Sequence, residues 1–290
     1  NVPRNTKILL TFKAAVDPRS LVNTTAVGAD GAPKYFDEAA GNRKSVTGLT
    51  LKNDAVQIIR TADIEGSTRE TDFAKYPSPV KVSFTSDLRT WVLEPPLLGS
   101  ASENVSYAEY VCGVKSPRGN CGGGITLLSG APAFSGRFTD YEWSFETGTF
   151  LDLTPPTITS IIPLHDNAQD AGMSGVLCER KDKPRNTLVQ LNFSEPMLPT
   201  TASGTVETDP MPPRAGSNGS YQGGARTSGS YAIMRVSPAG GRTLAGEWRI
   251  GNEYQTVEFT PADRCGRNAC GQDVFCLPGR ENLTVQALSA

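Results

Sequence analysis

The sequence predicts an all-β chain made of two tandem antiparallel β-sandwiches. Three observations predict it: an internal repeat, apolar residues that alternate with a period of two, and short segments separated by Pro, Gly, Asn and Asp. Residues 3–18 (PRNTKILLTFKAAVDP) and 184–199 (PRNTLVQLNFSEPMLP) are identical at seven of sixteen aligned positions. A chain of 290 residues is long enough for each copy to bury its own core.

Alternating apolar residues mark the first expected strand of each copy: Ile8, Leu10 and Phe12 in the first, and Val189, Leu191 and Phe193 in the second. A period of two predicts a strand with one buried face. A second correspondence matches TWVLEP (90–95) with TVEFTP (256–261) and adds Val257 and Phe259 to the expected core. Pro18 and Pro199 close the repeated segment, where we expect the chain to turn.

Other expected strands are AVQIIR (55–60), VKVSF (80–84) and the alternating segment from Tyr141 to Phe145, while residues 35–45 have the composition of one helical turn. Pro155 and Pro156 form a short, stiff connection between the copies. We therefore predict one domain over residues 1–152 and a second over residues 153–290.

Composition excludes two classes of partner. The net charge of -2 leaves no basic surface for nucleic acid. No apolar run approaches the roughly 20 residues of a membrane-spanning helix, so we expect no membrane insertion. The first residues also lack the pattern of a signal peptide.

Cysteine usage favours an oxidising, extracellular location. Six cysteines permit three disulfides, and the candidates are Cys112, Cys121, Cys178, Cys265, Cys270 and Cys276. A local bridge between Cys112 and Cys121 would leave Cys178 to pair with one member of the last cluster, although spacing alone does not fix the connectivity. Zinc is the alternative, but the last cluster lacks the C-x2-C spacing typical of structural zinc sites.

Sequons of the form N-x-S/T give a second indication of a secreted protein, and they occur at Asn23, Asn104, Asn192, Asn218 and Asn282. Five are a modest excess over chance. They make covalent glycans a candidate feature of an extracellular or cell-surface protein. Because Asn192 alternates with Leu191 and Phe193, it should point away from the core.

Several segments carry a family resemblance. TPPTITSIIP, NTLVQLNFSEPMLP and TVEFTP in the second copy, with YEWSFETG in the first, resemble the bacterial Ig-like repeat of surface-layer proteins and adhesins. The same segments also resemble repeats in extracellular fibre and flagellar-hair proteins of algae. FSEPM (193–197) is the most specific element. The resemblance implies two tandem Ig-like sandwiches and a structural or adhesive role.

The two copies differ at their outer ends. The first has no counterpart of TPPTITSIIP, and the second has no counterpart of DYEWSFET (140–147). We therefore expect the first domain to lack its first strand and the second domain to lack its last. Such edges attract another chain, supplied either by a longer polypeptide or by strand exchange between subunits.

No motif for catalysis or cofactor binding is present. His165 has no G-x-S-x-G nucleophile to accompany it, and the glycine runs do not precede GKS or GKT. Asp152, Asp166 and Asp170 are candidate calcium ligands, although solvated loop acids are more common. Trp91, Trp143 and Trp248 could form a sugar platform, but strand spacing favours the core for the first two.

These observations predict a non-enzymatic structural segment of an extracellular fibre, sheath or surface layer. Its expected partners are copies of itself or adjacent repeats, joined by sandwich packing and strand pairing. The alternative is a cell-surface adhesin that binds glycan or protein through the inserted loops 26–54 and 202–229. A third possibility is an accessory module of a secreted enzyme.

Overall fold

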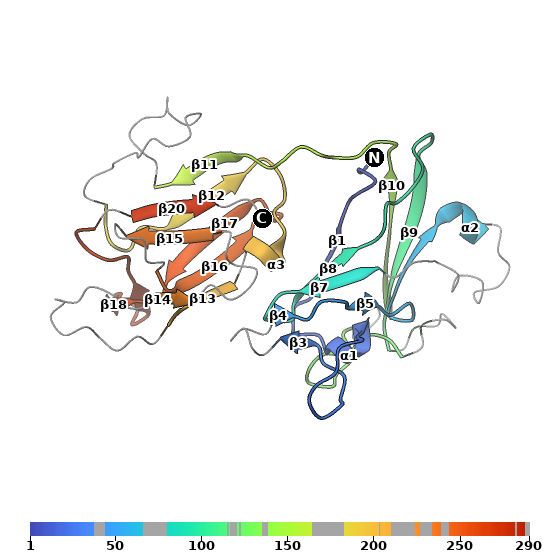
Figure 1. Cartoon of the computed structure of the whole chain (residues 1–290), viewed down its shortest axis with the longest axis horizontal. Helices are drawn as coiled ribbons and strands as arrows, with labels where there is room; N and C mark the ends of the chain where they lie inside the picture. Colours follow the sequence, from blue (N-terminus) through green and yellow to red (C-terminus); the bar gives the residue numbers. More distant parts are fainter. Residues whose placement is uncertain are drawn as a thin grey trace. The chain divides into compact units, whose positions relative to one another are not determined.

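The chain forms two compact units, Asn1–Thr154 and Pro155–Ala290, which meet two residues from the predicted boundary (Figure 1). The structure is a computed structural model, and it describes residues 1–37, 44–65, 80–114, 116, 121, 123–134, 139–163, 183–202, 204–209, 224–226, 234–238, 244–281 and 283–287. In both units the strands pair antiparallel, as predicted for an all-β chain.

The described residues of the first unit form two main sheets. The five-stranded sheet has the order β1-β8-β7-β5-β2: β1 (Ile8–Thr11), β8 (Thr90–Glu94), β7 (Lys81–Phe84), β5 (Thr50–Leu51) and β2 (Val22–Asn23). The three-stranded sheet has the order β10-β9-β6: β10 (Asp140–Thr147), β9 (Val105–Cys112) and β6 (Val56–Arg60). A small hairpin pairs β3 (Phe36–Asp37) with β4 (Lys44–Ser45).

Side chains from both sheets form the core of the first unit. Ile8 and Trp91 come from the five-stranded sheet, and Ile58 and Tyr107 come from the three-stranded sheet. The indole Nε1 of Trp91 donates to the carbonyl of Leu88 at 3.0 Å, so its polar atom is satisfied inside the core. The opposite face of β9 and β6 is covered by the short helix α2 (Thr61–Glu65).

In the second unit, the residues that the structure describes form one large sheet, one small sheet and a hairpin. The six-stranded sheet has the order β11-β12-β17-β16-β13-β14: β11 (Ile158–Ile162), β12 (Val189–Phe193), β17 (Thr256–Pro261), β16 (Gly246–Gly251), β13 (Gly204–Asp209) and β14 (Gly224–Arg226). The small sheet pairs β15 (Met234–Pro238) with β20 (Leu283–Ala287). A separate hairpin pairs β18 (Arg264–Arg267) with β19 (Asp273–Phe275).

The second core is separate from the first. It gathers Leu191 and Phe259 from the large sheet and Val236 from the small sheet. Trp248 of β16 is 1% exposed and packs against Phe259 with ring centroids 5.0 Å apart. Trp91 is fully buried, as predicted, whereas Trp143 is half-buried against the first core.

The repeat in the sequence is also a repeat in strand pairing. Equivalent residues have equivalent cross-strand partners: Ile8–Leu93 and Leu10–Trp91 in the first unit, and Val189–Phe259 and Leu191–Val257 in the second. One face of β12 is buried, and Asn192 lies on the other face, so the predicted register is correct.

The ends of the segment 35–45, whose composition predicts one helical turn, pair as the hairpin of β3 and β4, and Phe36 packs edge-on against Phe84 with ring centroids 5.6 Å apart. Residues 38–43 lie outside the described part of the chain. The repeated prolines begin one-turn helices, α1 (Pro18–Leu21) and α3 (Pro199–Ala202), rather than simple turns. Proline suits the first position of a helix because no amide partner is needed there.

Candidate functional site: the open sheet edges

Of the residues considered for calcium binding, Asp152 alone lies in the described part of the chain. Within those residues, no group of three or more His, Cys, Asp or Glu side chains could hold a metal ion. Asp152 accepts from the backbone amide of Thr154 at 3.0 Å, and its own amide donates to Asn5 Oδ1 at 3.0 Å. His165, Asp166 and Asp170 lie outside the described residues.

Two disulfides lie in the described residues. Cys112 of β9 is joined to Cys121, with a Cα–Cα distance of 5.6 Å. Cys265 of β18 is joined to Cys276, with a Cα–Cα distance of 5.7 Å, and the bridge closes the hairpin of β18 and β19. Cys270, exposed in the turn of that hairpin, has no disulfide partner among the described cysteines. Cys178, expected to pair with a member of this cluster, lies outside the described residues.

The described sequons differ in their surroundings. Asn23 and Asn104 are exposed, and Asn104 Nδ2 donates to Glu146 at 3.2 Å. Asn192 is half-buried on the outer face of β12, where Nδ2 donates to Ser160 Oγ at 2.7 Å and Oδ1 accepts from Thr256 Oγ1 at 2.7 Å. The Asn192 amide therefore links β11, β12 and β17. Asn218 and Asn282 lie outside the described residues.

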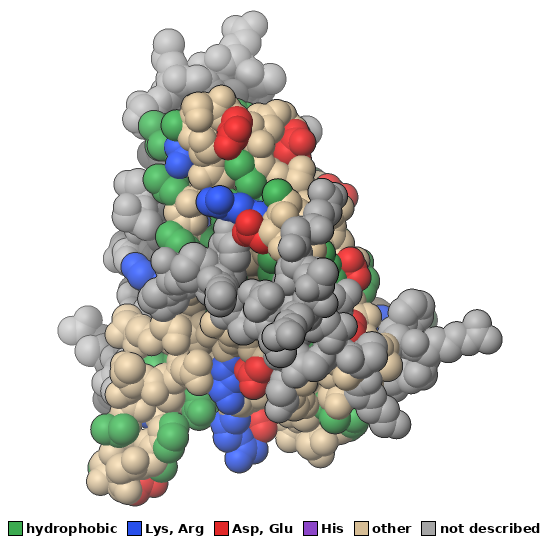
Figure 2. Space-filling view, turned by 90° about the vertical axis from the view of Figure 1, so that its right-hand side faces the viewer, with side chains coloured by type: hydrophobic (Ala, Val, Ile, Leu, Met, Phe, Trp, Pro, Cys, Tyr) green, Lys and Arg blue, Asp and Glu red, His purple; other side chains and the backbone are tan. Residues whose placement is uncertain are grey.

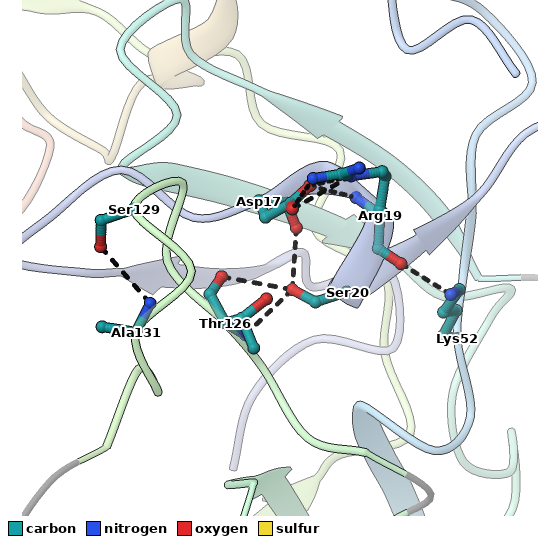
Figure 3. A network of polar contacts seen from close by, with 7 residues as sticks. All are labelled: Asp17, Arg19, Ser20, Lys52, Thr126, Ser129 and Ala131. Carbon is teal, nitrogen blue, oxygen red and sulfur yellow. Dashed lines mark hydrogen bonds and ion pairs between the residues drawn. The ribbon is translucent and has the colours of Figure 1, made fainter.

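A polar network fastens the helix α1 to a neighbouring loop (Figure 3). Asp17 caps the helix and accepts from the backbone and the guanidinium of Arg19, the shortest contact being 2.7 Å. Ser20 Oγ donates to the Asp17 carbonyl at 2.8 Å and accepts from the Thr126 amide at 3.1 Å. Burial raises the pKa of Asp17, but the hydrogen bonds from Arg19 outweigh it and lower the pKa overall. The network has a structural role.

Glu109 is the most unusual polar residue of the first unit, and the sequence did not single it out. It lies on the core-facing side of β9 between Tyr107 and Val111, opposite Ile58 of β6 and Trp143 of β10. Its exposure is 0%, and neither carboxyl oxygen has a hydrogen-bond partner in the described structure. Burial raises the pKa of Glu109 to about 8. The carboxyl group is therefore held neutral inside the core at neutral pH.

An open edge distinguishes the small sheet of the second unit. In the first unit β9 is paired on both sides, with β6 and with β10. In the second unit β20 pairs with β15, and no described strand pairs with its other side. Among described residues, the position that β10 occupies beside β9 has no counterpart beside β20.

In the large sheets it is the first unit that has fewer described strands at the corresponding edge. In the second unit β12 pairs with β17 and with β11, whereas in the first unit the equivalent strand β1 pairs with β8 and with no other described strand. Val2 forms a parallel bridge with Thr147 of β10, so the residues before β1 run beside the other sheet. Each unit therefore lacks, among its described residues, one edge strand that the other has.

The remaining observations concern charge on one face, membrane-spanning helices and the comparisons with known proteins. On the face drawn in Figure 2, basic and acidic side chains are interspersed among the coloured residues rather than gathered by sign. In the described part of the chain, no helix has the length and apolar character needed to cross a membrane. Comparison with protein-family models, curated proteins and solved structures finds no match.

Proposed function

We propose that this chain is a non-enzymatic structural segment of an extracellular fibre, sheath or surface layer. In this proposal the two units are Ig-like β-sandwich modules that pack against neighbouring modules and pair strands with them. The observation that carries it is a complementary pair of edges: among the described strands, β1 has no neighbour of the β11 type, and β20 has no neighbour of the β10 type. Unpaired backbone groups at a sheet edge favour association with another strand.

Three further observations support the proposal. The disulfides between Cys112 and Cys121 and between Cys265 and Cys276 suit an oxidising extracellular compartment. The exposed sequon residues Asn23 and Asn104 are sites where a glycan would meet solvent. Repeated modules with separate cores are also a common way to build long extracellular proteins, since each module folds on its own core.

Self-assembly tests the proposal. The purified chain, with its disulfides formed, is concentrated and observed by negative-stain electron microscopy and by light scattering after size-exclusion chromatography. We expect regular filaments or sheets with a repeat set by the module length. Monomers at every concentration and salt would overturn the proposal. Monomers that also bind a defined sugar through loops 26–54 or 202–229 would support the adhesin in its place.

A further inference from the structure

We propose that the open edge of β20 is an acceptor site for one extended strand of the β10 type, supplied by a neighbouring module. This inference rests on the proposed function and makes it specific. It names the acceptor, Leu283–Ala287, and the chemistry of the donor: a segment with apolar side chains at every second position and polar side chains between them.

The first unit shows the occupied form of the site. There β10 runs antiparallel to β9 along its whole length, from Asp140 opposite Cys112 to Thr147 opposite Val105. Its core-facing side chains Trp143 and Phe145 pack against the core, and Phe145 stacks on Tyr107 with centroids 5.5 Å apart. The same chain therefore contains a template for the missing strand.

Side-chain exposure shows what the missing strand would cover. The core-facing residues of β9 are closed off from solvent: Tyr107, Glu109 and Val111 are 1%, 0% and 2% exposed. On β20, Val285 lies directly opposite Val236, which is fully buried, so both side chains are on the core-facing side of the sheet. Val285 is nevertheless 37% exposed. An apolar side chain on the inner side of a sheet is exposed in this way when its neighbouring strand is absent.

Backbone directions agree with an acceptor edge. The carbonyl of Val236 accepts from the amide of Leu244 at 2.7 Å and is therefore directed away from β20. In an antiparallel pair, the amide N–H and the carbonyl of one residue point to the same side of the strand. Two residues directly opposite each other either exchange both backbone hydrogen bonds or exchange none. Since the carbonyl of Val236 points away from β20, Val236 and Val285 exchange no backbone hydrogen bonds. The amide and carbonyl of Val285 therefore point away from β15, toward the edge where another strand could pair.

The large sheet of the second unit leaves a second apolar side chain uncovered. Ile158 of β11 lies opposite Phe193, a core residue, and is on the same side of the sheet, yet it is 47% exposed. The large and the small sheet of this unit thus each have an edge strand with an exposed apolar side chain on its core-facing side: Ile158 of β11 and Val285 of β20. A strand with the alternating pattern of β10 supplies the apolar side chains that such an edge needs, whereas a polar loop or a helix does not.

A synthetic peptide tests the acceptor directly. The peptide TDYEWSFETGT, residues 139–149 of this chain, is added to the full-length protein under conditions where the protein is dispersed. Hydrogen exchange is then read at the amides of β20 by mass spectrometry. We expect the peptide to slow exchange in β20 by about tenfold or more, because strand pairing protects amides that are otherwise open to solvent. Exchange in β9 serves as an internal control and should not change.

Two controls decide the result. A peptide with serine in place of Trp143 and Phe145 keeps the length and charge but loses the apolar face, and it should leave β20 unprotected. Val285→Pro removes one amide that faces the open edge, and it should abolish the protection of β20. Val285→Ala keeps that amide and should retain the protection. Unchanged exchange in β12 and β17 shows that the variant is folded. Absent protection of β20, or equal protection by the control peptide, overturns the inference.

The outcome is separate from that of the proposed function. Protection of β20 is measured on dispersed protein, so it does not depend on whether filaments form. Regular polymers that form equally well with Val285→Pro would keep the structural role and reject β20 as the acceptor. Protection of β20 by the peptide in a protein that never polymerises would support the acceptor and reject the fibre.

Discussion

Glu109 makes the stability of the first unit depend on pH. Its carboxyl group titrates at about 8 in the folded protein, compared with 4.5 for an unperturbed glutamate. Below pH 4.5 the group is protonated in both the folded and unfolded states, and its protonation adds no pH dependence. Between 4.5 and 8 the unfolded chain releases the proton while the folded chain retains it, so the free energy of unfolding falls as pH rises.

The size of the effect follows from the two pKa values. Each unit of pKa difference corresponds to about 1.4 kcal/mol, so a rise from 4.5 to about 8 removes about 5 kcal/mol of stability by pH 8 and above. That loss is comparable with the whole stability of a small domain, about 5 to 15 kcal/mol. The first unit should therefore be markedly less stable in alkaline than in mildly acidic solution.

Glu109→Gln isolates this contribution. Glutamine has nearly the shape of a protonated glutamate and does not ionise, so the variant should match the wild type within about 1 kcal/mol near pH 5. At pH 8 to 9 it should be more stable by about 5 kcal/mol. Urea denaturation of the first unit, followed by the fluorescence of Trp91 and Trp143, measures the difference at each pH.

The matched control is Glu94→Gln. Glu94 is on β8, where its exposed carboxylate accepts from Lys7 at 2.9 Å, and loss of that pair should cost less than about 1 kcal/mol. The free energy of unfolding is plotted against pH for the wild type and for Glu109→Gln. Parallel curves would refute the reasoning. They would show that the Glu109 carboxyl group finds a polar partner or water in solution.

Three further changes test the packing. Phe193→Ala should cost about 3 to 5 kcal/mol in urea denaturation, because the ring is 6% exposed in the second core; a loss below about 1 would contradict its placement. Cys121→Ser opens the loop to Cys112 and should cost the first unit about 2 to 3 kcal/mol. Asn192→Ala should cost about 1 to 2 kcal/mol through lost hydrogen bonds, and the exposed Asn104→Ala far less; equal losses would reject that role.

The sequence predicted the parts of the fold that alternate in hydrophobicity. Leu191 and Phe193 are buried, and Asn192 between them is not, because a pleated strand with one covered face imposes that order. The repeat also predicted that β1 and β12 would be equivalent, since identical residues at corresponding positions favour the same pairing.

Other parts were not predictable by the same reasoning. The strand β9 (Val105–Cys112) is buried at six successive positions, so it shows no alternation, and its pairing with β6 and β10 depends on segments distant in sequence. Strands of two residues such as β2 and β5 are too short to show a period. The helix α1 had a local signal in Asp17 followed by Pro18, which is typical of a helix N-terminus.

The candidate site was predicted only at the level of missing edges. Comparison of the two copies indicated which edge strand of each copy has no counterpart in the other, but the exposure of Val285 depends on how β20 packs. Glu109 could have been suspected from the segment Tyr107 to Val111, where alternation places the glutamate on the same side as two apolar residues. Its lack of a partner depends on side chains from β6 and β10, which no local pattern specifies.

The separate cores of the two units have a mechanical consequence. The units follow one another along one backbone, so a pulling force passes through both, yet each can unravel without disrupting the interior of the other. Unfolding of the first unit alone would lengthen the chain by about 500 Å, because its 154 residues span about 3.4 Å each when extended. In alkaline surroundings the ionised Glu109 would make that unit yield first, so single-molecule stretching should record two peaks, of which one weakens as pH rises. A tether built this way lengthens under load before it breaks.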